Sequence, residues 1–326
     1  MLFFLGSKVE IEASIFHNNT SDGVSFGGVI SSYGSTVTVT MSEFDQSSAS
    51  FGGAIFIASG NLKIEACTFR NNSAKTHGAV LHASHSNVTI AESEFDGNYA
   101  SYGAHYFYSS NVTIRSSHYI NNRATYGAGL YSRETDIRID SSHFASNNAT
   151  DKGGGLYSLD SNVMIKRTKF IGNRVIFSLG NGAALHSHRS NITLEATRIE
   201  NNTAASVGGV YSTLSNIIME ACVMSNNMGG AIHSSGGYII SIRASQFYKN
   251  VGTRSGRVID LRSHGSISID ACDFIENSAR NGGALFCVSR NISITRSKFN
   301  KNTATQKGGA LYFFDSKIRM GDCNFK

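Results

Sequence analysis

A motif of about 25 residues recurs along almost the whole chain and constrains its fold more than any other feature. Each copy has an aromatic or apolar residue followed three positions later by Asn, and successive copies start 23 to 29 residues apart. The third position is Asn in eleven of the twelve copies that contain it. Self-similarity at such a period predicts a solenoid, in which each repeat buries its apolar face only against its neighbours. The motifs begin at Phe16, Phe44, Phe69, Phe95, Tyr119, Phe144, Phe170, Ile199, Met224, Phe247, Phe274, Phe299 and Phe325.

Short alternating segments within each repeat predict β-strands. Before the motif lie two apolar residues with one residue between them, as in residues 88–90 (VTI) and 112–114 (VTI). Such alternation with β-branched residues is typical of a strand with one buried face. A second apolar segment follows a glycine turn, as in residues 52–55 (GGAI) and 308–311 (GGAL). We therefore predict an all-β fold, a single-stranded right-handed parallel β-helix (a pectin-lyase-like solenoid) with about 12–13 coils of ~25 residues.

Two further positions of the repeat predict stacks along the solenoid. The recurrent Asn can bond backbone groups in a turn, and we expect its amides to form a ladder. A small residue lies two positions before each motif, and Cys67, Cys222, Cys272 and Cys323 occupy this position. Neighbouring cysteines among the last three are two coils apart, about 10 Å, whereas a disulfide needs Cα atoms within roughly 7 Å. We therefore predict free, buried thiols.

The domain organisation follows from the same periodicity. A solenoid grows by adding turns, so we expect residues 1–326 to form one continuous parallel β-helix. Solenoid ends expose unpaired strand edges unless a cap covers them. The chain stops at Lys326, directly after a motif Phe. We expect a fragment that lacks N- and C-terminal caps.

Composition and charge exclude several classes of partner. The formal net charge is +6, but Lys and Arg are scattered singly, whereas a nucleic-acid face shows clustering. No stretch approaches the ~20 apolar residues of a membrane-spanning helix, and no metal-type CxxC spacing occurs. We predict no cofactor, no metal site, no nucleic-acid partner and no transmembrane segment in this chain.

The two signatures of each coil resemble the GGA[IL] and FxxN repeats of the chlamydial polymorphic membrane proteins. FxxN occurs eight times, and GGA followed by Ile or Leu begins at Gly52, Gly229, Gly282 and Gly308. The resemblance covers the whole chain and implies an adhesin-like rod that is extracellular or exposed at the cell surface. In that family the repeats are mainly scaffold, so no catalytic residue is carried over. The chain shows neither the export signal nor the C-terminal β-barrel of the complete family architecture, so anchoring is not implied.

A stripe of mostly aromatic residues after the glycine turns is the candidate binding site, provided that these side chains point outward. Aromatic faces in a row can stack on sugar rings or on a partner chain. The alternative is a self-stacking ladder that only stiffens the sheet. The stripe comprises Phe56, Leu81, Tyr106, Tyr131, Tyr157, His186, Tyr211, His233, Asp260, Phe286 and Tyr312.

A second, charged stripe offers a candidate catalytic site. Polysaccharide hydrolases use two carboxylates about 5–5.5 Å or 6.5–9.5 Å apart, and the first distance suits neighbouring coils. Like charges so placed raise one pKa and provide an acid. The alternative is a solvated stack whose repulsion an arginine relieves. The stripe comprises Glu195, Glu220, Arg243 and Asp270.

Three functions remain open from the sequence. The leading hypothesis is a non-enzymatic surface or extracellular rod that binds glycans or surface proteins along its side. The alternatives are a polysaccharide lyase or hydrolase and a purely structural scaffold segment of a larger protein. If the chain is such an enzyme, substituting Glu195 or Glu220 by Gln abolishes turnover, whereas substitutions in the tyrosine stripe do not.

Overall fold

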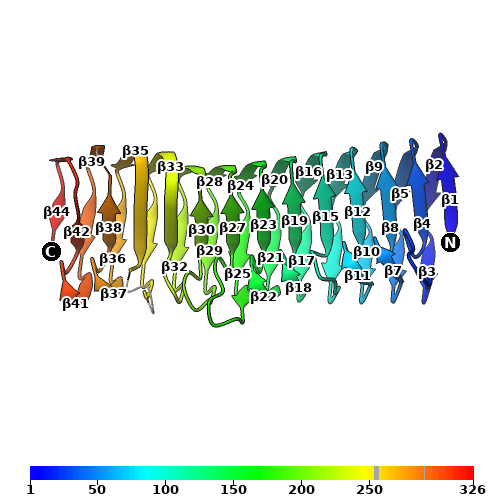
Figure 1. Cartoon of the computed structure of the whole chain (residues 1–326), viewed down its shortest axis with the longest axis horizontal. Helices are drawn as coiled ribbons and strands as arrows, with labels where there is room; N and C mark the ends of the chain where they lie inside the picture. The colour runs from blue at the N-terminus through cyan, green and yellow to red at the C-terminus, as the bar shows by residue number, and fades with distance from the viewer. Residues whose placement is uncertain (253–256, 290) are drawn as a thin grey trace. The chain divides into compact units, whose positions relative to one another are not determined.

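The computed structural model describes residues 1–252, 257–289 and 291–326. The chain is an all-β, right-handed parallel β-solenoid of about 12 turns, and the described residues contain no helix. Two compact units are distinguished, unit 1 (Met1–Val163) and unit 2 (Met164–Lys326). Strands of successive turns lie side by side within each unit (Figure 1). The predicted fold class is confirmed.

Three strands of each turn of unit 1 form three parallel rows. Row A follows the glycine turn, row B is the alternating apolar segment, and row C contains the motif aromatic. The row A strands are β1 (Leu2–Leu5), β4 (Ile30–Tyr33), β8 (Ile55–Ala58), β12 (Leu81–Ser84), β15 (His105–Tyr108), β19 (Leu130–Arg133) and β23 (Leu156–Leu159); those of row B are β2 (Lys8–Glu12), β5 (Thr36–Thr40), β9 (Asn61–Glu65), β13 (Asn87–Ala91), β16 (Asn111–Arg115) and β20 (Asp136–Asp140). The row C strands are β3 (Ile15–His17), β6 (Glu43–Asp45), β10 (Thr68–Arg70), β14 (Glu94–Asp96), β17 (His118–Ile120) and β21 (His143–Ala145), and the loops that return to row A hold β7 (Ser48–Phe51), β11 (Ser73–His77), β18 (Arg123–Tyr126) and β22 (Asn148–Lys152).

Unit 2 repeats this arrangement, with one difference. In two turns rows A and B merge into the 12-residue strands β33 (Ile232–Arg243) and β35 (Ile259–Asp270), the longest arrows in Figure 1. Strand β24 (Asn162–Lys166) contains the boundary between the units. The other row A strands are β27 (Leu185–His188), β30 (Val210–Thr213), β38 (Leu285–Val288) and β42 (Leu311–Phe313); those of row B are β28 (Asn191–Glu195), β31 (Asn216–Glu220), β39 (Asn291–Thr295) and β43 (Ile318–Gly321). Row C comprises β25 (Lys169–Ile171), β29 (Arg198–Glu200), β32 (Val223–Ser225), β34 (Gln246–Tyr248), β36 (Asp273–Ile275), β40 (Lys298–Asn300) and β44 (Asn324–Phe325), and the loop strands are β26 (Arg174–Val175), β37 (Ser278–Asn281) and β41 (Thr303–Lys307).

The motif aromatics form the centre of the core. In unit 1 the rings of Phe44, Phe69, Phe95, Tyr119 and Phe144 are 0% exposed. Centroids of successive rings are 4.5–5.2 Å apart, close to the spacing of paired strands. Because every motif residue pairs in register with that of the next turn, one aromatic position per repeat produces a continuous stack.

The recurrent Asn residues form the predicted ladder. The Asn72 amide nitrogen Nδ2 donates to Asn98 Oδ1 (3.1 Å) and to the Phe44 carbonyl (2.9 Å). The backbone N–H of Asn72 also donates to Asn98 Oδ1 (2.9 Å), and Asn98 bonds Asn122 in the same way. The buried turn therefore has its polar groups satisfied from one turn to the next.

The small residues form a second internal stack. The backbone N–H of Cys67 donates to Ser93 Oγ (3.1 Å), and that hydroxyl donates to the Ala91 carbonyl (2.7 Å). All five cysteines are free, as predicted, and four are buried, whereas Cys323 is half-buried. The side chains of this stack thus form hydrogen bonds with backbone N–H and C=O groups at the bend between rows B and C.

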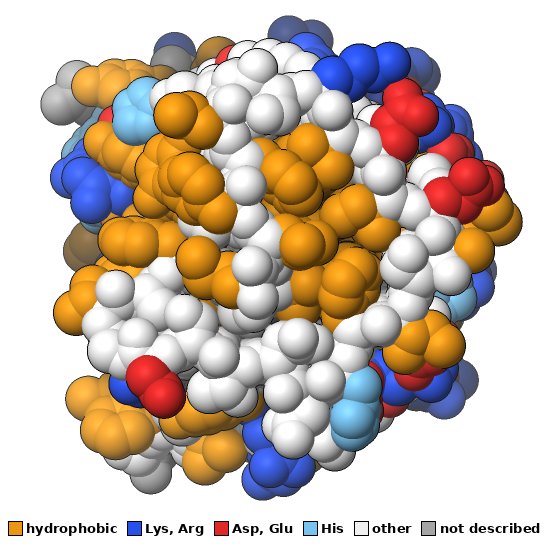
Figure 2. All heavy atoms as spheres, turned by 90° about the vertical axis from the view of Figure 1, so that its right-hand side faces the viewer, with side chains coloured by type: hydrophobic (Ala, Val, Ile, Leu, Met, Phe, Trp, Pro, Cys, Tyr) orange, Lys and Arg blue, Asp and Glu red, His pale blue; other side chains and the backbone are white. Residues whose placement is uncertain are grey.

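The first turn of unit 1 shows which side chains become buried when one turn stacks on the next. Figure 2 shows hydrophobic side chains gathered on the face of this turn. Phe16 and Val9 of the first turn are half-buried, whereas Phe44 and Val37 of the next turn are at most 1% exposed. Each turn thus buries its inner side chains against both neighbours.

Candidate functional site

The side chains of the aromatic stripe stand on the outer face of row A. Phe56 pairs with His82, His82 with Tyr106, Tyr106 with Tyr131, and Tyr131 with Tyr157. The flanking side chains on each strand point inward, because Ile55 and Ile57 beside Phe56 are 0% exposed. The outward orientation required by the prediction is therefore present.

One member of the predicted stripe was wrong. Leu81 is 0% exposed and pairs with the inward Ile55, and His82 occupies the stripe position. In this turn the glycine pair is Gly78 followed by Ala79, and Gly78 has the positive φ (66°) of the first glycine of the pair. The stripe position of Leu81 follows only if Gly78 is equated with the second glycine of the pair. That choice shifts the strand by one residue and exchanges its inner and outer faces.

The stripe residues of unit 1 form a parallel stack, which we call the row A ladder (Phe56, His82, Tyr106, Tyr131 and Tyr157). Successive centroids are 4.9–5.2 Å apart and successive planes differ by 6–27°. Each ring therefore covers the face of the next one. A ligand approaching from the side meets ring edges and phenolic oxygens rather than ring faces.

A second ladder lies beside the first and was not predicted. It consists of Phe26, Phe51, His77, Tyr102 and Tyr126 (the loop ladder), with successive centroids 4.8–5.4 Å apart. The two ladders meet edge to face, with centroids 4.3 Å apart for His77 and Tyr106 and 5.2 Å apart for Tyr102 and Tyr131. The sequence signal was an aromatic residue directly before the first glycine of the turn in five successive repeats.

Burial between the ladders keeps these rings uncharged. Phe56 and Tyr131 are only 5% and 7% exposed. Burial raises the pKa of Tyr131 and of Tyr106. Burial, with a smaller contribution from His77, lowers the pKa of His82 to about 3. Tyr106, Tyr131 and His82 are thus uncharged at physiological pH.

The stripe of unit 2 is interrupted by a buried ion cluster. His186, Tyr211 and His233 stack with centroids 4.9 and 4.8 Å apart, and Phe286 stacks on Tyr312 at 5.2 Å. Between these two stacks lies Asp260, which is 2% exposed.

The carboxylate of Asp260 is held by three side chains. It accepts hydrogen bonds from Arg257 (2.9 Å) and Arg262 (3.0 Å), and His233 Nδ1 lies 3.2 Å away. Burial raises the pKa of Asp260, but the hydrogen bonds from His233 and Arg262 and the nearby charges outweigh burial, so the net shift is downward. The Arg257 guanidinium lies 3.8 Å from the centroid of the Phe286 ring. Asp260 is therefore a structural anion that links the two aromatic stacks.

The predicted charged stripe is brought together on four successive turns of row B. Glu195 pairs with Glu220, Glu220 with Arg243, and Arg243 with Asp270. Lys166 Nζ lies 2.6 Å from a carboxylate oxygen of Glu195. These pairings place two carboxylates on adjacent turns, as expected from the repeat.

The electrostatics at the far end of this stripe oppose acid catalysis. The Arg296 guanidinium hydrogen-bonds both carboxylate oxygens of Asp270, and the Thr295 hydroxyl donates to the same group (2.8 Å). The hydrogen bonds from Arg296 and then Thr295 lower the pKa of Asp270 to about 2. A general acid needs a pKa near the working pH, so Asp270 is held in the form that cannot donate a proton.

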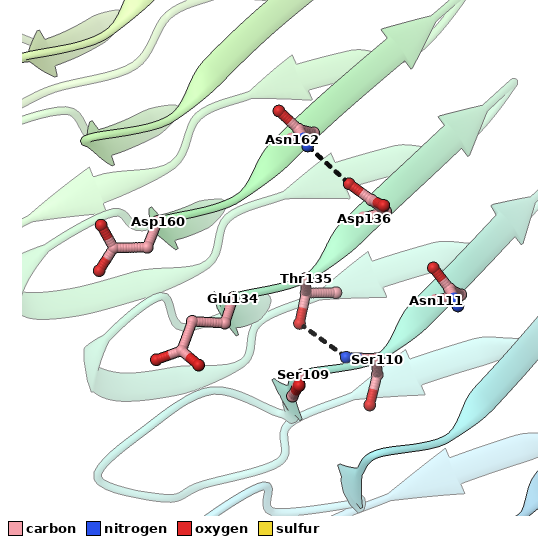
Figure 3. Close-up of a pocket in the computed structure, with 8 residues that line it drawn as sticks. All are labelled: Ser109, Ser110, Asn111, Glu134, Thr135, Asp136, Asp160 and Asn162. Atoms are coloured by element: carbon pink, nitrogen blue, oxygen red, sulfur yellow. Dashed lines mark hydrogen bonds between the residues drawn. The ribbon is translucent and has the colours of Figure 1, made fainter.

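A polar hollow of about 410 Å³ crosses the corners between rows A and B in unit 1 (Figure 3). Asn162 Nδ2 donates to Asp136 (2.7 Å), and the Ser110 N–H donates to Thr135 (3.4 Å). Glu134 and Asp160 extend away from the Asp136–Asn162 pair. The acidic groups do not converge, and within residues 1–252, 257–289 and 291–326 there is no group of three or more His, Cys, Asp or Glu suited to a metal ion. No helix in the described part of the chain has the length and apolar character to cross a membrane.

Comparison with known proteins identifies the type of repeat. The family described as "Right handed beta helix region" matches residues 2–144 and 78–247. The Chlamydia polymorphic membrane protein repeat matches residues 297–313. No curated protein matches the chain.

Two solved structures show a weak similarity to this chain over most of its length. An alginate lyase from Paenibacillus sp. str. FPU-7 has 11% sequence identity and a TM-score of 0.32, with 93% of this chain and 99% of that chain covered. The family 28 exopolygalacturonase of Yersinia enterocolitica has 10% identity and a TM-score of 0.26, with 97% and 72% covered.

Proposed function

The chain belongs to the right-handed β-helix family, and we propose that it is a non-enzymatic, adhesin-like scaffold that binds glycans along the sides of its turns. We place it outside the cell or at the cell surface. The match to a polymorphic membrane protein repeat at residues 297–313 supports this location.

The paired aromatic ladders of unit 1 carry this proposal. Within the row A ladder, Tyr106, Tyr131 and Tyr157 put a phenolic ring at the same strand position in three successive turns, spaced about 4.8 Å apart. Tyrosine has an apolar ring and a polar hydroxyl group, so it suits a surface that contacts both apolar groups and water. Phe56 and Phe286, each 5% exposed, support the stacks. The ligand contacts that we propose are the phenolic groups of Tyr106, Tyr131, Tyr157, Tyr211 and Tyr312.

Asp270 of the charged stripe is unsuited to the role of general acid. Asp270 is bound by Arg296 and has a pKa of about 2, and Glu195 is paired with Lys166. A hydrolase needs one carboxyl group whose pKa is raised and another that remains ionised. Asp270 is shifted in the opposite direction from the acid of such a pair.

The test removes phenolic oxygens while keeping the stacks. Tyr106, Tyr131 and Tyr157 are replaced together by Phe, and retention on immobilised plant, microbial and animal polysaccharides is compared with that of the unsubstituted chain. We expect retention of the unsubstituted chain and at least a several-fold loss in the triple variant. Tyr99→Phe is the matched control, because Tyr99 is 59% exposed and belongs to neither ladder. Equal retention of all three proteins excludes these phenols as contacts.

A further inference from the structure

The turns with merged rows carry a break in the repeat. In the preceding turns a Ser forms the corner between rows A and B, and the Ser190 N–H donates to Ser215 Oγ (2.9 Å). The next turn has Gly237 there, and a Cβ on this residue would lie 2.0 Å from the Ser215 carbonyl oxygen. The strand runs on without a corner, and the N–H groups of Tyr238 and Ile239 both donate to Asn216 Oδ1 (3.1 and 3.0 Å).

The break exposes an aromatic ring that no parallel ring of the described residues covers. Tyr238 is 69% exposed, and the His264 ring lies 6.4 Å away, tilted by 51°. Rings in the row A ladder, by contrast, stack at 4.9–5.2 Å. Ile239, next to Tyr238 in the chain, and Leu214, whose side chain lies against Gly236, are also exposed (49% and 55%). The break thus presents apolar surface that the regular corner does not.

Two adjoining hollows of about 590 and 420 Å³ lie along this break. Both are lined by Ser263, His264 and Val288, and together they form what we call the trough. The lining extends from Leu214 to Asp315 and includes residues of five successive turns, about 19 Å at the strand spacing. Each hollow has the volume typical of a ligand site, and the trough as a whole suits an elongated ligand.

We propose that the trough binds an oligosaccharide chain, with a sugar ring stacked on Tyr238. This inference rests on the proposed function and adds a second site, distinct from the aromatic ladders. A sugar ring offers an apolar face to an aromatic ring and hydroxyl groups along its edge. The exposed His264 ring and Asp315 carboxylate supply hydrogen-bond partners, and Leu214 and Val288 supply apolar walls.

The strand pairing disfavours a peptide as the ligand. A peptide that adds to a sheet needs a strand with an unpaired edge. Strand β33 pairs with β30 and β31 on one side and with β35 on the other, and β35 pairs in turn with β38 and β39. Both edges of β33 and of β35 are thus paired over most of their length, so strand addition is disfavoured and recognition rests on the side chains of the trough.

The test measures binding of labelled hexasaccharides of cellulose, chitin and polygalacturonate by saturation-transfer NMR and by titration. We expect at least one of them to bind, with about tenfold weaker binding in Tyr238→Ala and near-normal binding in Tyr238→Phe, which keeps the ring. Tyr99→Ala is the matched control, since that residue is similarly exposed and lies outside the trough.

The possible failures are distinguishable. Hexasaccharide binding that Tyr238→Ala and His264→Ala both leave unchanged overturns the trough assignment and leaves the proposed function standing. Retention on polysaccharides without binding of any hexasaccharide also overturns the trough alone. Loss of a protein partner in Tyr238→Ala, with no saccharide bound, reassigns the trough to proteins and overturns the inference. Absence of both hexasaccharide binding and polysaccharide retention overturns the proposed function as well.

Discussion

A buried histidine–tyrosine pair in unit 1 gives a quantitative test of the packing. The inward position of row A is Ile55, Leu81 and Leu130 in neighbouring turns but His105 in one turn, and the motif aromatic of that turn is Tyr119 rather than Phe. Both side chains are 0% exposed, and the Tyr119 hydroxyl lies 3.1 Å from His105 Nδ1. Among the described residues His105 Nε2 has no hydrogen-bond partner.

The pair predicts that the effects of the two single substitutions on the free energy of unfolding are strongly non-additive. His105→Leu leaves the Tyr119 hydroxyl unpaired, and Tyr119→Phe leaves both nitrogens of His105 unpaired, each at a cost of about 1–3 kcal/mol. The double variant reproduces the Leu and Phe pairing of neighbouring turns and removes every unpaired group. We therefore expect the double variant to be at least as stable as the unsubstituted chain, with a coupling energy of about 1–3 kcal/mol.

The same pair predicts a pH dependence. Burial lowers the pKa of His105 to about 3, whereas an unfolded histidine has a pKa of about 6.5. Between these values the unfolded chain binds the additional proton, so stability decreases as pH falls from 6.5 towards 3. The contribution of His105 is at most about 1.4 kcal/mol per pH unit. His105→Leu removes this contribution.

The assay is equilibrium urea unfolding at several pH values between 7 and 4.5 for both single variants and the double variant. Since a solenoid can unfold in parts, hydrogen exchange of the strands β15 and β17 reports on the same turn. His118→Leu, at an exposed position, controls for the loss of a histidine. A double variant less stable than either single variant, or an unchanged pH slope in His105→Leu, refutes the reasoning.

Three further predictions concern the turns and stacks. Asn122→Ala removes four hydrogen bonds of the buried Asn ladder, and we expect it to lower the free energy of unfolding in urea by about 3 kcal/mol or more. The exposed control Asn111→Ala is expected to change this free energy by no more than about 0.5 kcal/mol. Equal effects of the two substitutions would show that the ladder is not a main source of stability. Burial raises the pKa of Cys272 to about 11, so its thiol is expected to resist a disulfide reagent at pH 8 until the chain unfolds, and rapid labelling of the folded chain contradicts this. Gly52→Ala places a Cβ 2.1 Å from a backbone oxygen, whereas Gly34→Ala has the same type of backbone (φ 60°) and open space; we expect a cost of about 1–2 kcal/mol for Gly34 and a clearly larger one for Gly52, and similar melting temperatures would contradict the clash.

The regular part of the fold was predictable because it depends on positions that recur. The motif Phe, the ladder Asn and the alternating pairs each recur about every 25 residues. Parallel pairing in register then places each of these residues next to the equivalent residue of the neighbouring turn. The same logic correctly aligned Glu195, Glu220, Arg243 and Asp270 on successive turns.

The features that escaped prediction depend on local departures from the repeat. Ala79 in place of a second glycine shifted the assignment of one row A strand, so His82 was missed. The loop ladder depends on how the loop before the glycine turn folds back over row A, which the strand pattern does not contain. One extra residue between rows A and B, at Gly236 and Gly237, accompanies the loss of the corner at the trough. Arg296, whose hydrogen bonds lower the pKa of Asp270, occupies a corner position of positive φ that recurs in each turn but carries Ala in the two preceding turns, at Ala244 and Ala271.

The most direct test of the central claim is one incubation with a panel of plant, microbial and animal polysaccharides in which retained protein and newly released reducing or unsaturated ends are measured together. We expect retention of the protein without release of ends. Release of ends that Glu195→Gln or Glu220→Gln abolishes would contradict the account and identify the chain as a polysaccharide-degrading enzyme.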